Sequence, residues 1–127
     1  MIDRIVLSQR AREQLVQLKR KTGIKHWNVL CRWALATSLA DSSKVSSKAH
    51  PSDSNVEMTW RTFAGDHDEV YLALLAARCE RDGFRDDAAG ILRLLRAHIH
   101  RGIGVLASRR DITDVRALFR HAESIPG

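Results

Sequence analysis

The sequence has 127 residues, 44% of them hydrophobic and 28% charged, which is the composition of an ordinary globular domain. It contains no run of about 18 apolar residues, and its charged N-terminus lacks the apolar centre of a signal peptide, so we expect neither a membrane span nor export from the cytoplasm. The formal net charge of +6 is concentrated in residues 1–50, which hold ten Lys and Arg against three Asp and Glu and so predict a polyanionic partner, most commonly nucleic acid.

The first forty residues predict a strand followed by two helices. Apolar and polar side chains alternate over residues 2–7, which is typical of a short strand. Ser8 offers an N-cap, apolar residues then recur at helical spacing, and Gly23 suits the left-handed position that ends a helix. A second helix is predicted over residues 27–39, and it is apolar on nearly every side.

The middle of the chain predicts a loop, a strand and a third helix. Residues 41–55, DSSKVSSKAHPSDSN, are rich in serine and contain a proline, which predicts a flexible loop. Alternation over residues 56–60 then predicts a second short strand. Asp66 and Glu69 have the spacing of a capping box, and they open a helix that we expect to stop at Gly83.

Two more helices are predicted in the C-terminal part, one from Asp86 to Gly102 and one capped by Asp111. The fold class is therefore mainly α, with a single domain over residues 1–127, two short strands and a disordered tail at 124–127. Residues 27–39 and 70–79 are more apolar than a monomer of this size needs, so we expect a homo-oligomer.

No motif for catalysis or for cofactor binding is visible. The sequence lacks a nucleophile elbow, a P-loop and a dinucleotide-binding glycine pattern. His98 and His100 are two residues apart on a helix and face different ways, so they do not suit a shared metal ion. Cys31 and Cys79 lie in apolar helical patterns and are interpreted as buried free thiols. We expect no metal, no cofactor and no catalytic residues, hence a protein that is not an enzyme.

Positive charge gathers at the corner between the first two predicted helices. Lys19, Arg20 and Lys21 lie where cations complement a helix C-terminus, and this capping needs no ligand. Lys25 and His26 lie at the start of the next helix, where a cation is unfavourable unless an anion joins it. A phosphate on the free N–H groups of that helix would account for both residues, so phosphate binding is favoured over capping alone.

The order of these first elements resembles that of the ribbon-helix-helix proteins. The matching segments are RIVLS, REQLVQLKRKTG and IKHWNVLCRWAL. In that family two chains pair their N-terminal strands, and the second helix points its N-terminus at the DNA backbone. The resemblance implies base contacts from the outward strand residues Arg4, Val6 and Ser8, of which only Arg4 is a strong base reader.

The chain as a whole resembles the DndE family of bacterial DNA sulfur modification. The segments that carry this resemblance are RIVLSQRAREQLVQLKRKTGIKHWNVLCRWALATSL, WRTFAGDHDEVYLALL and LLRAHIHRGIGVL, and it extends over residues 1–121. The family acts in replacing a non-bridging phosphate oxygen of DNA by sulfur. The resemblance implies a small helical tetramer that binds duplex DNA, preferentially at nicks, alongside other sulfur-modification proteins. It implies no reaction on this chain.

Two hypotheses follow. In the first, the chain is a DNA-binding accessory component of the phosphorothioation system, cytoplasmic and without sequence specificity. In the second, it is a ribbon-helix-helix repressor with a specific operator. The residues predicted to contact DNA are Arg4, Arg10, Lys19, Arg20, Lys21, Lys25, His26 and Asn28.

Overall fold

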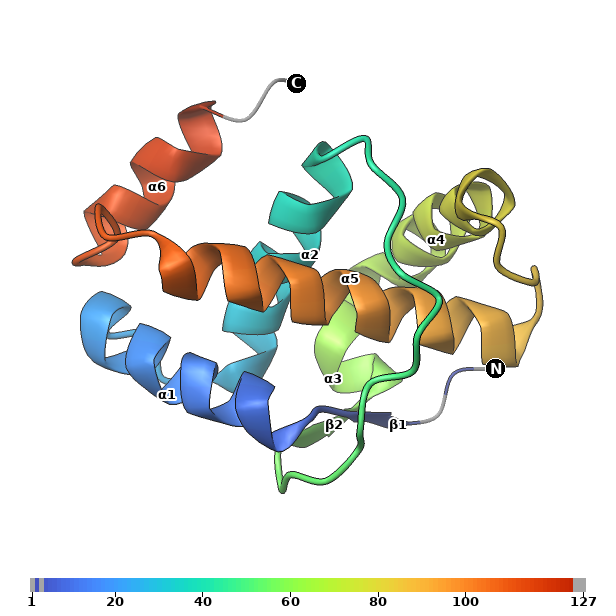
Figure 1. Ribbon diagram of the computed structural model, residues 1–127, viewed down its shortest axis with the longest axis horizontal. Coiled ribbons are helices and arrows are strands. Elements are labelled where there is room, and N and C mark those ends of the chain that lie inside the picture. Colours follow the sequence, from blue (N-terminus) through green and yellow to red (C-terminus); the bar gives the residue numbers. More distant parts are fainter. Residues whose placement is uncertain (1, 3, 125–127) are drawn as a thin grey trace.

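The computed structural model describes residue 2 and residues 4–124, and it is mainly helical, as predicted (Figure 1). The two predicted strands are present, and the predicted order of the long helices is confirmed. The tail predicted at 124–127 lies outside the described residues, apart from Ser124, which ends the last helix. In chain order the elements are β1 (Arg4–Val6), α1 (Gln9–Thr22), α2 (Trp27–Ala40), β2 (Glu57–Thr59), α3 (Trp60–Ala64), the 3-10 helix η1 (Gly65–His67), α4 (Asp68–Asp82), α5 (Ala88–Ser108) and α6 (Val115–Ser124).

Helix α5 is the central element of the fold. It runs across the middle of the molecule and packs against α1, α2 and α4, with its most extensive contact on α2 (Figure 1). Its buried face joins the core residues of the neighbouring helices, so one hydrophobic core unites the chain. The fully buried apolar side chains that α5 contributes to this core are Leu94, Leu95, Ile99, Ile103 and Leu106.

The predicted end of this helix at Gly102 is wrong, because α5 continues to Ser108. Gly102 lies against the backbone of α2, where an added Cβ would stand 1.8 Å from the Ala34 carbonyl oxygen. The glycine therefore lets two helices approach closely and does not terminate one. Glycine in the last turn and glycine at a helix crossing look alike in a sequence.

Three helix starts also differ from the prediction. The N-cap of α5 is Asp87, which accepts from the Gly90 N–H at 2.8 Å, so Asp86 lies outside the helix. Asp66 lies in η1, and α4 begins at Asp68 without a side-chain cap, so the predicted capping box is not formed. Asp114, rather than Asp111, accepts from the Ala117 N–H at 2.8 Å at the start of α6. In each case an acidic residue close to the true cap supplied the same sequence signal.

The second strand is shorter than predicted, because Trp60 begins a helix that the sequence analysis missed. Thr59 caps α3 by accepting from the Thr62 N–H at 3.1 Å. Trp60 and Phe63 are buried, so this short helix fills the space between the strands and α4. Five residues are too few for a periodic pattern to show.

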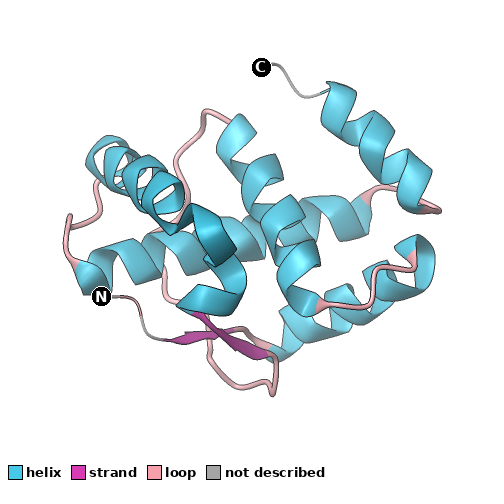
Figure 2. Ribbon diagram, turned by 180° about the vertical axis from the view of Figure 1, so that it is seen from behind, coloured by secondary structure: helices cyan, strands magenta, loops and turns pink. Residues whose placement is uncertain are grey.

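Strand β1 pairs with β2 of the same chain in an antiparallel register, Arg4 opposite Thr59 and Val6 opposite Glu57 (Figure 2). The outward carbonyl of Val6 accepts a hydrogen bond of 2.8 Å from Arg96 Nε of α5. A ribbon-helix-helix protein would instead pair this strand with a second chain. The ribbon-helix-helix likeness is therefore not confirmed by the fold of the chain.

Candidate nucleic-acid interface

The predicted basic corner is formed by the end of α1, a short turn and the start of α2. Helix α1 ends at Thr22, and Gly23 adopts the left-handed conformation, with φ 74°, that the sequence predicted. Its N–H donates to the Lys19 carbonyl at 2.9 Å, which closes the helix and reverses the chain. Lys19, Arg20 and Lys21 occupy the last turn of α1, and Lys25 and His26 directly precede α2. We call these five residues the basic corner.

Lys19 joins the two sides of the basic corner. Its ammonium nitrogen lies 4.0 Å from the ring centroid of Trp27, the first residue of α2, in a cation–π contact. This contact is worth about 0.5–1 kcal/mol at an exposed site. Lys19 therefore contributes to holding the turn, in addition to its charge.

The other cations of the basic corner face solvent. Arg20 and Lys25 are exposed and Lys21 is half-buried, and none of the three forms a hydrogen bond or an ion pair with a residue that the structure describes. Their positive charge is consequently not neutralised within the described part of the chain. It is available to an anion.

The start of α2 follows directly after Lys25. His26 is the N-cap residue, exposed and without a side-chain capping bond, and its carbonyl accepts from the N–H groups of Val29 and Leu30 at 3.2 and 3.4 Å. The earlier N–H groups of a helix have no partner within the helix and carry partial positive charge. An uncapped helix start beside free lysines suits a phosphate.

Asn28 and Arg32 do not face this anion position. Asn28 Nδ2 donates to the carbonyl of Thr62 at 3.4 Å, and Arg32 Nη1 donates to the carbonyl of Phe63 at 2.9 Å. Both side chains thus bind the C-terminal end of α3 and fix α2 against it. Asn28 was predicted to contact DNA. Its bond to Thr62 instead assigns it a role in positioning α2.

Arg4 and Arg10 lie away from the basic corner. Arg4 is in β1 and pairs with Glu57 of β2 at 3.4 Å, so part of its charge is balanced. Arg10 is in the first turn of α1, about 16 Å along the helix from Lys21. It lines an open cleft of about 510 Å³ with residues such as Gln14 and His100. The structure therefore divides the predicted contacts into one group at the corner and two separate arginines.

Five arginines that the sequence analysis did not single out hold residues 41–55, which we call the connecting segment. Their guanidinium groups donate to backbone carbonyls in and next to it, from Ser38 to Pro51, over distances of 2.7–3.5 Å. The segment has no helix or strand, as predicted, and its flexibility stays a prediction. The arginines, from α4 and α5, are Arg78, Arg81, Arg93, Arg96 and Arg101.

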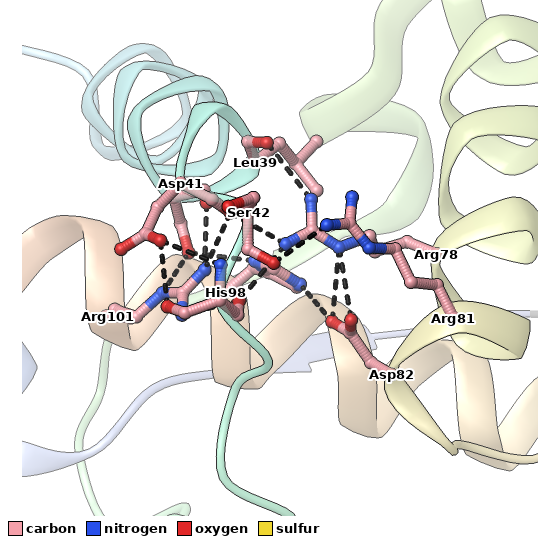
Figure 3. A network of polar contacts seen from close by, with 10 residues as sticks. Leu39, Asp41, Ser42, Arg78, Arg81, Asp82, His98 and Arg101 are labelled. Carbon is pink, nitrogen blue, oxygen red and sulfur yellow. Dashed lines mark hydrogen bonds and ion pairs between the residues drawn. The ribbon is translucent and has the colours of Figure 1, made fainter.

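A buried polar network supports two of these arginines (Figure 3). Asp82 accepts from Arg78 Nε at 3.2 Å, and its other partner is His98 Nε2, also at 3.2 Å. His98 Nδ1 lies 2.8 Å from Ser38 Oγ, which accepts from Arg101 Nε at 2.8 Å. The Asp82 carboxylate only accepts, so Nε2–H of His98 donates to it, and Nδ1 of the neutral imidazole accepts from the Ser38 hydroxyl.

The succession of serine, histidine and aspartate in this network resembles that of a hydrolase triad. Ser38 is only 1% exposed, however, and its oxygen already accepts from Arg101, so a substrate cannot reach it. Burial lowers the pKa of His98 to about 4, which keeps the imidazole neutral at pH 7. The network joins α2, α4 and α5, and its role is structural.

The other histidine of the pair, His100, has separate partners. Its Nε2 accepts from the Ser8 N–H at 3.1 Å, its Nδ1 lies 2.6 Å from the Arg96 carbonyl, and its ring stacks on His50 at 4.1 Å. Burial also lowers the pKa of His100 to about 4. Among the described residues, no group of three or more His, Cys, Asp or Glu side chains could hold a metal ion.

Both cysteines are free and buried, as the sequence predicted. Burial raises the pKa of the Cys31 thiol to about 12, and it raises the pKa of Cys79 as well. Neither thiol is therefore a reactive nucleophile at neutral pH. No helix in the described part of the chain combines the length and the apolar character that crossing a membrane requires.

Comparison with known proteins connects this fold with a DNA modification system. A family model described as "DNA sulphur modification protein DndE" matches residues 4–114. The solved structure of a DndE from Escherichia coli B7A, described as involved in DNA phosphorothioation modification, is 23% identical, with a TM-score of 0.69 over 84% of this chain and 98% of that one. A DndE mutant described as involved in DNA phosphorothioation is 21% identical, with a TM-score of 0.67 over 86% of this chain and all of that one. No curated protein sequence matches the chain.

Proposed function

We propose that this chain, which belongs to the DndE family of DNA sulphur modification proteins, is a DNA-binding component of a phosphorothioation system. The observation that carries the proposal is the basic corner, where Arg20, Lys21 and Lys25 have no partner among the described residues and the start of α2 is uncapped. Most other arginines near the core are bound to backbone carbonyls. The basic corner thus gathers several cations that are available to DNA.

The proposed contact is with the phosphate backbone. Ammonium and guanidinium groups of the corner neutralise phosphates, and the first N–H groups of α2 donate to a phosphate oxygen. Phosphates carry no base identity, so binding is independent of sequence. Arg4, the strongest candidate for reading a base, is paired with Glu57 and supports this preference for backbone contacts.

A preference for nicked duplex follows if each subunit of an oligomer presents one corner. Contacting two corners at once requires the duplex to bend, and bending a site of 20–30 base pairs by 40–90° costs about 1–6 kcal/mol. A nick interrupts one of the two strands that resist bending and lowers this cost. The nicked duplex therefore binds more tightly without any group that recognises the nick itself.

The remaining parts of the proposal concern assembly and location. Val70 and Leu74 on α4 are 57% and 51% exposed, and such an apolar pair supports self-association, for which we propose four subunits. Other sulfur-modification proteins are the proposed partners, and the cytoplasm is the proposed location. We assign DNA binding, and no reaction, to this chain.

The competing hypothesis of a ribbon-helix-helix repressor makes a different prediction about specificity. A repressor prefers its operator by a factor of about 10³ or more over unrelated DNA. The backbone binder that we propose has similar affinities for all sequences and differs only between DNA structures. In the chain, β1 is already paired with β2, which disfavours the repressor.

The experiment that tests the proposal measures the affinity of the full chain for intact, nicked and single-stranded DNA of several unrelated sequences. We expect nicked duplex to bind more tightly than intact duplex for every sequence. A single sequence bound about 10³-fold more tightly than the others would favour the repressor. Absence of binding to any DNA at low salt would refute the proposal.

A further inference from the structure

The last helix, α6, begins after residue 114, where the part of the chain that the family model matches ends. It is anchored to the helices of the basic corner: it packs on α1, His121 Nε2 lies 3.2 Å from Thr37 Oγ1 of α2, and Phe119 meets Trp33 edge-on at 5.7 Å. Ala117 and Leu118 of α6 itself are buried. The beginning of α6 lies next to the end of α1 (Figure 1).

The side of α6 that is not buried carries positive charge. Arg116 and Arg120 are exposed and four residues apart, which places them on one face of the helix. Arg110, in the preceding loop, is exposed as well. None of the three forms an ion pair or a hydrogen bond with any residue in the described part of the chain, whereas the neighbouring Arg109 pairs with Asp111 at 2.8 Å.

Helix stability does not explain Arg116. Arg116 lies in the first turn of α6, where a cation is unfavourable because the helix N-terminus is itself positive. Lys25 has the same unfavourable place at the start of α2. Two helix starts with unpaired cations, on helices that both contact α1, favour an anion outside the chain as the partner of both sets of charges.

We propose that Arg110, Arg116 and Arg120 form a second group of DNA phosphate contacts, which α6 adds to the basic corner. This inference rests on the proposed DNA binding. Packed helices lie about 8–10 Å apart, and each DNA strand carries one phosphate per 3.4 Å of helix axis. Cations on α1 and α6 can therefore contact nearby phosphates of one duplex, so the bound DNA spans both helices.

Three double variants of the full chain test the inference, and each removes two positive charges: Arg116→Ala with Arg120→Ala, Lys21→Ala with Lys25→Ala, and Lys44→Ala with Lys48→Ala. The last pair is the control, because both lysines are exposed on the connecting segment and unpaired among the described residues. Affinity for nicked duplex is measured by fluorescence anisotropy over a range of salt concentrations, and thermal melting confirms that each variant folds.

We expect the α6 variant to bind about tenfold more weakly than the wild type at about 0.1 M salt, with a slope of log affinity against log salt lowered by up to about two units per engaged subunit. The control keeps the wild-type slope. An α6 variant with wild-type affinity and slope, beside a weakened Lys21 and Lys25 variant, would overturn the inference and leave the proposed function standing. Equal losses of DNA affinity in the α6 variant and in the control would show that only the net charge of the chain matters. That result would also overturn the inference.

The alternative is that a second protein, and not DNA, binds the exposed face of α6 through Phe119. If Phe119→Ala and the α6 arginine variant both change the mass in light scattering while DNA affinity stays at the wild-type value, α6 is a protein contact and the inference fails. A wild-type protein that binds no DNA would overturn both the inference and the proposed function. A Phe119→Ala variant that retains its mass and its DNA affinity agrees with phosphate contacts from the arginines alone.

Discussion

Gly102 of α5 and Ala34 of α2 are in backbone contact, so close that a Cβ on the glycine would stand 1.8 Å from the Ala34 carbonyl oxygen. We predict that Gly102→Ala separates the two central helices and lowers the free energy of unfolding by about 3 kcal/mol or more. Gly104→Ala is the matched control, because it lies two residues further along α5 and has no atom within 4 Å of an added Cβ. It should stabilise the helix by about 0.5–1 kcal/mol. Urea unfolding of both variants checks this, and similar stabilities would contradict the contact.

A second prediction concerns the charge of Asp82, whose buried carboxylate accepts from Arg78. Asp82→Asn keeps the shape of the side chain but leaves the Arg78 guanidinium without its counter-charge. The expected loss is about 3–5 kcal/mol in the free energy of unfolding. Glu80→Gln, an exposed position on the same helix, should change it by no more than about 0.5 kcal/mol. Equal changes in the free energy of unfolding for the two variants would show that the hydrogen bonds from Arg78 to backbone carbonyls stabilise its charge without Asp82.

The pH dependence of stability provides a third prediction. Burial lowers the pKa of His98 and of His100 to about 4, whereas an unfolded histidine titrates near 6.5. Between these values the unfolded chain binds protons that the folded chain does not. The stability contributed by the neutral imidazoles is therefore complete above pH 6.5 and is lost as the pH falls towards 4.

His98→Gln tests this dependence, because a glutamine amide can donate to Asp82 without titrating. We expect a shallower decrease of stability between pH 6.5 and 4 than in the wild type, with part of the remaining slope due to His50, His100 and His121, whose pKa values burial also lowers. Thermal melting at several pH values measures the slopes. An unchanged slope in the variant would mean that His98 does not titrate differently in the folded state.

A fourth prediction concerns self-association through α4. Leu74 is 51% exposed and lines a shallow pocket of about 270 Å³ with Leu39 and Ala77. If this face joins subunits, Leu74→Glu places a charge in an apolar interface and yields monomers of about the 14.3 kDa chain mass. Ala73→Glu, at an exposed position one residue earlier, is the control and should retain the oligomer. Light scattering that finds the wild type to be a monomer would refute self-association itself.

Local signals predicted the elements at the N-terminus well. In the structure α1 begins after Ser8 and ends before Gly23, as the sequence indicates. These limits could be predicted because capping bonds join residues only three or four positions apart. The basic corner was predicted for the same reason: it is formed by neighbours in the sequence. Arg4 and Arg10 were predicted as further DNA contacts, Arg4 from the ribbon-helix-helix resemblance, and they lie away from the corner.

Long-range contacts account for what the sequence could not predict. Whether Gly102 ends a helix or lies at a helix crossing depends on Ala34, which is 68 positions away. The arginines that hold the connecting segment donate to carbonyls about 35–65 positions away, and backbone carbonyls have no sequence signature. For that reason arginine charges that are used within the fold looked available to a partner.

The central claim is that the basic corner holds DNA phosphates, and one measurement tests it most directly. Nicked duplex is titrated at low salt with the wild type, with Lys21→Glu plus Lys25→Glu, and with Lys44→Glu plus Lys48→Glu as a control of equal charge change. The account predicts that reversal at the corner weakens binding at least about tenfold for every DNA sequence, beyond any effect of the control, with folding nearly unchanged. Corner variants that bind nicked duplex as tightly as the wild type would contradict it.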